Sequence, residues 1–261
     1  MPSARSIPPE QIEEARRRLT GIIKPTPLIR SATLDRIFDA HVLIKPENLQ
    51  KTGSFKIRGA YNRLATLADD QKSRRVVAAS AGNHGQALAY AATRASVSAT
   101  IVMPTTAAIA KIDATRSYGQ SVVLEGVDYQ EARAAAVKMC TERGASFIDA
   151  YDDPEVIAGQ GTVGLEIADE VTPDVVIVPV GGGGLIAGVA AALATRAPDA
   201  EVIGVEAAGS PQLSASLAAD ADRRDETGTG QRRVGILNAR IGFDFSLRDR
   251  RLADELDGAR R

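Results

Sequence analysis

Apolar positions along the middle of the chain fall into short, uninterrupted runs separated by longer, mixed stretches. The runs VVAAS, ATIVMP, SVVLEG and ASFIDA lie between residues 76 and 150, and DVVIVPV and EVIGVEA follow between residues 174 and 207. Continuous apolar strands that alternate with helices are typical of a parallel sheet covered by helices on both faces. The pattern therefore predicts an α/β protein.

The stretches between these runs, and one stretch ahead of them, are predicted to be helical. They are Pro9–Thr20, Gln86–Thr93, Ala107–Ser117, Tyr129–Arg143, Pro154–Glu170 and Leu185–Thr195. Gly21 is a natural stop for the first helix. After it, KPTPLIR carries alternate prolines, which favour an extended backbone, and HVLIKPE predicts a short strand.

The predicted elements group into two α/β units. The smaller spans residues 70–148, and the larger is discontinuous, built from residues 1–69 and 149–261. Ligands of parallel sheets bind beyond the carboxyl ends of the strands, so we expect an active site between the two units.

Composition narrows the class of protein. With 44% apolar and 25% charged residues and a net charge of −1, the chain resembles an ordinary globular protein, and nothing points to a nucleic-acid or membrane partner. A single cysteine excludes a disulfide within the chain, which fits a reducing compartment. No apolar run approaches the roughly 18 residues that span a bilayer. A cytoplasmic location is expected.

Three motifs carry candidate chemistry. In KTGSFKIRGA, Lys56 lies at a predicted helix start and near Lys51. The positive end of the helix dipole and a second ammonium both disfavour protonation, as Schiff-base chemistry requires. Taken alone this signal is weak, because most lysines are simply solvated.

The other two motifs each join a strand to a helix. SAGNHGQA follows VVAA, and its backbone N–H groups at a helix start suit a carboxylate. His84 within it is expected to hydrogen-bond structurally rather than to act as a base. PVGGGGL follows DVVIV, and its four glycines suit a phosphate. No metal site is expected, because the only other histidine is His41.

Together, KTGSFK, SAGNHGQA, PVGGGGL and the linking segment DDPEVIAGQGTVGLEI resemble the fold-type-II pyridoxal-phosphate enzymes, most closely threonine dehydratases and serine racemases. The resemblance covers residues 12–217. It implies a two-domain fold with the active site between the domains, pyridoxal 5′-phosphate as cofactor, a small amino-acid substrate and a homo-oligomer.

The resemblance also implies roles for individual residues. Lys56 would hold the cofactor as a Schiff base and then move the substrate's α-proton, beside the ring-packing Phe55. Asn83 would bind the cofactor's ring hydroxyl, and the substrate carboxylate would lie at Ser80, Ala81, Gly82, Asn83 and His84. The cofactor phosphate would be held by Gly181, Gly182, Gly183, Gly184 and Leu185.

The implied activity is that of an ammonia-lyase, which converts L-threonine to 2-oxobutanoate or L-serine to pyruvate, with ammonia. Racemases of this family have a serine where this chain has Ala81. Alanine has no proton to deliver to the second face of the substrate, which favours dehydration. The alternatives are a serine racemase-like enzyme, a β-replacement enzyme, or an impaired cofactor-binding or subunit-interaction protein.

The C-terminal stretch departs from the family pattern. Residues 221–261 contain ten Arg, no Lys and eight acidic residues, and no regular alternation of strands and helices is expected there. The residue that meets the cofactor's ring nitrogen is not identifiable, and Glu206 lacks the acidic neighbours of the family's metal pattern. We expect either a truncated or frameshifted end, or a substitute helix that covers the core.

Overall fold

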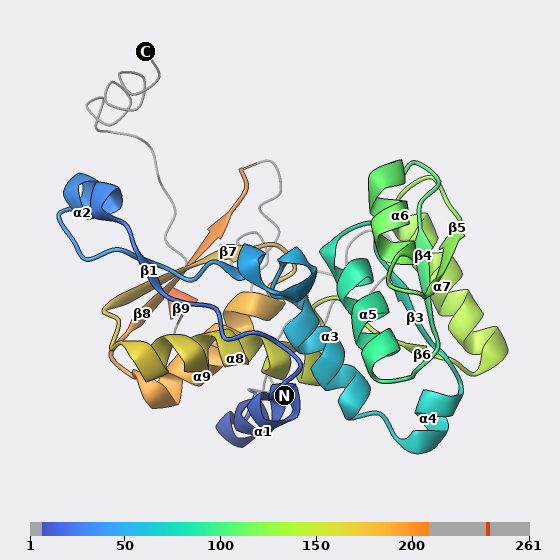
Figure 1. The fold of residues 1–261 in the computed structure, drawn as a ribbon, viewed down its shortest axis with the longest axis horizontal. Helices are drawn as coiled ribbons and strands as arrows, with labels where there is room; N and C mark the ends of the chain where they lie inside the picture. The colour runs from blue at the N-terminus through green and yellow to red at the C-terminus, as the bar shows by residue number, and fades with distance from the viewer. Residues whose placement is uncertain (1–6, 209–238, 241–261) are drawn as a thin grey trace, which may run out of the picture.

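The computed structural model describes residues 7–208 and 239–240, which form two parallel sheets and one antiparallel strand pair (Figure 1). The pair joins β1 (Ile29–Arg30) to β2 (Leu43–Ile44). The first parallel sheet has the strand order β5-β4-β3-β6 and the second β7-β8-β9. The predicted α/β class is confirmed.

The first parallel sheet contains the four runs expected from the sequence. Its strands are β3 (Val76–Ala79), β4 (Ala99–Met103), β5 (Ser121–Leu124) and β6 (Ser146–Phe147). Its helices are α4 (Asp69–Ser73), α5 (Asn83–Arg94), α6 (Ile109–Arg116) and α7 (Tyr129–Arg143). One buried cluster joins Ala78 and Ile101 to α5, and another joins Val77 and Val102 to α7. Both faces are therefore covered, as predicted.

The second parallel sheet contains β7 (Val175–Val180), β8 (Glu201–Glu206) and β9 (Ala239–Arg240). Helices α8 (Pro154–Glu170) and α9 (Gly184–Arg196) bury Val178 and Val202 on one face. On the other face Ile177 is 61% exposed within the described residues. The described residues therefore place the helices of this sheet on one of its faces.

Helix α3 (Lys56–Ala65) lies between the two groups of elements (Figure 1). Its Ile57, Ala60 and Leu64 belong to the core of the first sheet, together with Val156 of α8. The chain reaches α3 through α1 (Pro9–Leu19), α2 (Ala32–Phe38) and the short 3-10 turns η1 (Glu47–Leu49) and η2 (Lys51–Gly53). Ser54 and Phe55 follow η2, and Lys56 is the first residue of α3.

Helix caps explain why α7 and α8 begin where the sequence places them. The side chain of Asp128 accepts the N–H of Glu131, and that of Asp153 accepts the N–H groups of Glu155 and Val156. Such a cap stabilises a helix by about 1 kcal/mol. Gly144 ends α7 in the left-handed conformation. The short helices α2 and α4 were not expected, because neither carries a long apolar period.

The C-terminal stretch, residues 221–261, lies outside the described residues except for β9. This strand pairs in parallel with β8, with Val202 opposite Ala239, and the expected truncated end or substitute helix lies outside the described residues. None of the described helices combines the length and the apolar character that crossing a membrane requires.

Candidate active site

Lys56 is half-buried, and its amine occupies a desolvated position. Its Nζ donates to the carbonyl oxygen of Ala150 at 2.7 Å and lies 5.3 Å from the centre of the Phe55 ring. Burial lowers the pKa of Lys56 to about 8, against the opposing effect of the Asp149 carboxylate. An amine with this pKa is neutral often enough near pH 7–8 to act as a nucleophile or base.

The cause of this pKa shift differs from the one expected. Lys56 does begin a helix, as predicted, but burial rather than a neighbouring ammonium lowers its pKa. Lys51 instead donates its Nζ to the carbonyl oxygen of Ile22. The expected role of Lys51 was therefore wrong, because its amine is directed to a carbonyl of the N-terminal segment.

His84 is buried in the first turn of α5. Its Nε2 donates to the carbonyl oxygen of Ile148 at 3.1 Å, and its buried Nδ1 has no hydrogen-bond partner among the described residues. Burial, together with the charge of Lys56, lowers the pKa of His84 to about 4. His84 is therefore a neutral hydrogen-bonding residue near Lys56, as the sequence favoured.

The backbone at the start of α5 is arranged as an open helix end. The hydroxyl of Ser80 accepts the N–H of Gly82 at 3.1 Å, and α5 begins at the exposed Asn83. Ala81 and Gly82 are half-buried. The free N–H groups at a helix start favour an anion. The assignment of these residues to the substrate carboxylate, and of Asn83 to the cofactor ring, stays a prediction.

The glycine run connects β7 to α9. Gly183 precedes the helix with a φ of +86°, a conformation that favours glycine, and Gly181 and Gly182 are exposed. A Cβ on Gly181 would meet no atom within 4 Å, whereas one on Gly182 would lie 2.3 Å from the Tyr151 ring. Gly184 is the first residue of α9, and Leu185 and Phe55 pack against the same buried cluster.

The segment Ile148–Tyr151, between β6 and α8, brings the three motifs together. His84 contacts Ile148, Lys56 contacts Ala150, and the ring of Tyr151 lies against Gly182. No functional role was predicted for this segment. The signal is its position at the end of the predicted run ASFIDA, ahead of the capped start of α8.

Asp149 fixes the shape of this segment. Its Oδ1 accepts the N–H groups of Tyr151 and Asp152, each at 3.0 Å, and its Oδ2 lies 3.6 Å from Nη2 of Arg133 in α7. These contacts hold the turn whose carbonyl oxygen, on Ala150, receives Lys56. Asp149 therefore acts on Lys56 both through geometry and through its charge.

These features suit a phosphate-bearing aldehyde cofactor. A desolvated lysine is available to bind the aldehyde, and the backbone around Gly181 leaves open space at a helix N-terminus, where a phosphate is favoured. In the described part of the chain, no group of three or more His, Cys, Asp or Glu side chains is arranged to hold a metal ion.

A desolvated lysine facing a glycine loop across one connecting segment defines a site of the kind used by lysine-bound cofactors. The chain belongs to the family of pyridoxal-phosphate dependent enzymes, whose family model matches residues 19–259. The match extends beyond Leu217, where the resemblance was expected to end.

Similar proteins within the family include ammonia-lyases and racemases. An L-threonine ammonia-lyase of Thermotoga maritima is 50% identical over 210 residues, which are 80% of this chain and 52% of that protein. The processed form of threonine deaminase isoform 2 from Solanum lycopersicum is 39% identical, with a TM-score of 0.78, covering 81% of this chain and 59% of that one. Maize serine racemase is 34% identical, with a TM-score of 0.80, covering 83% and 66%. The chain thus spans about half the length of the curated relative.

The low pKa of the buried His84 predicts that the free energy of unfolding depends on pH. Its folded pKa of about 4 lies below the ordinary 6.5, so the unfolded chain binds more protons between these values. The contribution of His84 to the free energy of unfolding is therefore fully present above pH 6.5 and is lost as the pH falls toward 4. The expected loss between pH 7 and pH 5 is about 2 kcal/mol.

Urea unfolding at both pH values tests this expectation. His84→Gln, which retains a donor for Ile148, should show a loss smaller by that amount, while His41→Gln at an exposed position should behave like the unmodified chain. Equal losses in all three proteins would contradict a neutral, buried His84.

Proposed function

We propose that this chain is a pyridoxal-phosphate-dependent ammonia-lyase that converts L-threonine to 2-oxobutanoate and ammonia, or L-serine to pyruvate and ammonia. The observation that carries the proposal is the placement of the Lys56 amine, which is desolvated and lies 2.7 Å from the carbonyl oxygen of Ala150. Ala150 belongs to the Ile148–Tyr151 segment, which also contacts His84 and Gly182. The names of the similar proteins support the choice of reaction.

In this proposal the cofactor supplies an electron sink that allows the α-proton and then the β-hydroxyl group to leave. Lys56 binds the cofactor and carries the α-proton at its Nζ, because its low pKa lets it both accept and release a proton. Gly181, Gly182, Gly183, Gly184 and Leu185 hold the phosphate at the start of α9. Ser80 to His84 hold the substrate carboxylate at the start of α5, with Asn83 toward the cofactor ring.

The wider organisation is part of the same proposal. Residues 70–148 form the small domain, and residues 1–69 and 149–261 form the large one. We further propose a homo-oligomer in the cytoplasm, acting on a small amino acid.

The release of keto acid from L-threonine by the purified protein, supplied with pyridoxal phosphate, tests this function. 2-Oxobutanoate should form in proportion to enzyme, with no product when the cofactor is withheld from the apoprotein. A protein that binds the cofactor at Lys56 and yet releases no keto acid from threonine or serine would instead be the cofactor-binding protein considered as the alternative.

A racemase is the second candidate, and Ala81 argues against it. Ala81 is half-buried beside the start of α5 and has no proton to donate. Ala81→Ser should raise the ratio of serine racemisation to pyruvate formation by about tenfold or more, because a hydroxyl is a proton donor. Chiral chromatography of the serine pool and a pyruvate assay give the two rates.

Ala134→Ser, at an exposed position of α7, is the matched control and should leave the ratio unchanged. If the unmodified protein interconverts the serine enantiomers faster than it makes pyruvate, the dehydratase assignment is wrong.

A further inference from the structure

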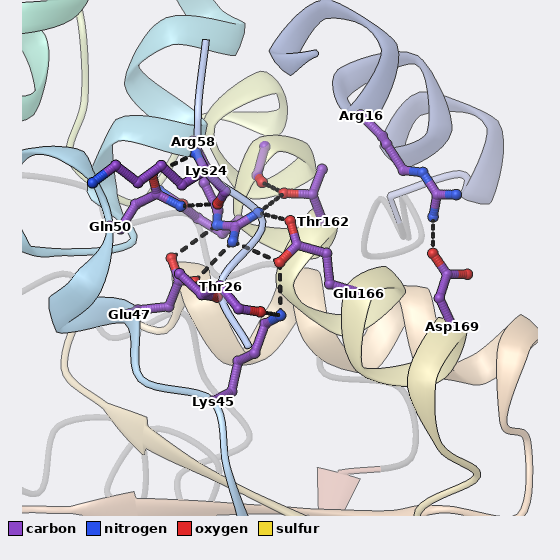
Figure 2. Close-up of polar contacts among 12 residues, drawn as sticks. Arg16, Lys24, Thr26, Lys45, Glu47, Gln50, Arg58, Thr162, Glu166 and Asp169 are labelled. Atoms are coloured by element: carbon purple, nitrogen blue, oxygen red, sulfur yellow. Dashed lines mark hydrogen bonds and ion pairs between the residues drawn. The ribbon is translucent and has the colours of Figure 1, made fainter. Parts of the chain in front are cut away.

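Arg58 is the largest fully buried side chain of the described residues, and it lies two positions after Lys56. Its guanidinium is held by two carboxylates (Figure 2). Nε and Nη2 donate to the two oxygens of Glu47 at 2.8 and 2.7 Å. Nη1 and Nη2 donate to the two oxygens of Glu166 at 2.5 and 2.9 Å. Paired hydrogen bonds of this kind fix both distance and orientation.

Two further side chains complete this cluster of buried charges. Nη1 of Arg58 also donates to the hydroxyl of Thr162 at 3.1 Å, and Lys45 approaches Glu166 at 2.8 Å (Figure 2). Burial opposes the ionisation of Glu166, but the hydrogen bonds from Arg58 prevail and keep its pKa below the ordinary value. Two cations thus face two carboxylates, and Lys45 also lies 3.9 Å from the exposed carboxylate of Glu170.

The cluster joins three parts of the chain around the start of α3. Glu47 belongs to η1, ahead of Lys56, and Glu166 and Thr162 belong to α8. At the same level α3 and α8 are in backbone contact: a Cβ on Gly159 would lie 2.6 Å from the carbonyl oxygen of Arg58. Helix α8 begins at Pro154, four residues after Ala150. By holding α3 against α8, Arg58 connects the helix of Lys56 to the helix that follows the segment receiving its amine.

A role in stability alone explains this arrangement poorly. The cost of removing four charged groups from water largely cancels their mutual attraction, so buried ion pairs are weak sources of net stability. What they fix is geometry. An arginine fork between two carboxylates permits one arrangement of η1, α3 and α8, and a lysine cannot reproduce it.

We propose that Arg58 is a positioning residue that holds the first turn of α3 against α8, and thereby keeps the Lys56 amine desolvated against Ala150. Arg58 touches neither cofactor nor substrate in this proposal. The inference rests on the proposed function of Lys56 as the cofactor-binding lysine, but its deciding measurement is made on the apoprotein, without the cofactor.

The test measures how fast the Lys56 amine of the apoprotein is acetylated as a function of pH, by peptide mass spectrometry. In the unmodified chain the midpoint should lie near pH 8. In Arg58→Lys the turn loosens and water reaches the amine, so the midpoint should rise by about one pH unit or more toward that of a solvated lysine. The affinity for pyridoxal phosphate should fall about tenfold.

Arg16→Lys is the matched control. Arg16 also pairs with a carboxylate of α8, Asp169, at 2.6 Å, but its side chain is 40% exposed (Figure 2). In the Arg16→Lys variant, the acetylation midpoint of Lys56 and the affinity for the cofactor should equal those of the unmodified chain. A thermal melt of each variant reports folding separately, so a loss of stability without a shifted midpoint would identify a merely structural role and overturn the proposal.

Glu166→Gln and Thr162→Val keep the proposal testable if Arg58→Lys does not fold. Each removes part of the fork with little change of shape, and each should move the midpoint upward by a smaller amount. Unchanged midpoints in both folded variants would overturn the proposal. Cofactor that fails to attach to Lys56 in the unmodified chain would contradict the proposed function, while the acetylation profiles would still decide the role of Arg58.

Discussion

Replacing Lys56 by alanine is expected to reduce kcat/KM for L-threonine by about 1,000-fold or more, because one amine both binds the cofactor and moves the α-proton. The protein should also lose its covalently held cofactor. The other lysines near the motif are engaged elsewhere: Lys51 donates to Ile22, and Lys45 pairs with Glu166. Neither amine is directed to the Ile148–Tyr151 segment that receives the amine of Lys56. Keto-acid formation and the visible absorbance of the bound cofactor measure the two effects.

Lys138→Ala is the matched control, because the Lys138 side chain is 74% exposed and lies at Glu142 on α7. It should retain full activity and cofactor content. An alanine variant at Lys56 that still releases 2-oxobutanoate at a comparable rate would contradict the assigned role of this lysine.

Alanine substitutions at Gly181 and Gly182 are expected to have large but different effects. A Cβ on Gly181 points into open space that the phosphate would occupy, so Gly181→Ala should keep the stability of the apoprotein and weaken cofactor binding by about tenfold or more. A Cβ on Gly182 would lie 2.3 to 2.6 Å from three atoms of the Tyr151 ring. Gly182→Ala must therefore displace Tyr151, and it should weaken both cofactor binding and stability.

Cofactor titration and thermal melts of the apoprotein separate these effects. Gly119→Ala offers a comparison for strain alone, because Gly119 has a φ of +85° but lies near Thr93, away from the site. It should lower stability and leave cofactor affinity unchanged. Wild-type affinity in both Gly181→Ala and Gly182→Ala would remove the glycine run from the phosphate site.

Local signals in the sequence predicted much of the fold. Helices α7 and α8 begin and end at the predicted residues, because Asp128 and Asp153 cap their starts and Gly144 or a change to extended backbone ends them. These signals act within a few residues and are readable without tertiary contacts. The strand ends that carry Ser80 and Gly181 were predictable for the same reason.

The interactions that connect the motifs were not predictable in this way. Arginine is mostly exposed in proteins, yet Arg58 is fully buried. Its partners Glu47 and Glu166 lie 11 and 108 residues away in the sequence. The burial that lowers the pKa of Lys56 depends on elements brought together only by the fold. Contacts of long sequence separation leave no periodic signal. The position of Lys56 at a helix start was therefore predictable, whereas burial as the cause of its lowered pKa was not.

The most direct test of the central claim is to reduce the protein with borohydride in the presence of pyridoxal phosphate and to map the modified peptide by mass spectrometry. Reduction makes the bond between the cofactor and its lysine permanent. We expect the added mass on Lys56, within the peptide that contains Ser54 and Phe55. Modification of Lys45 or Lys51 in place of Lys56, or no stable modification at all, would contradict it.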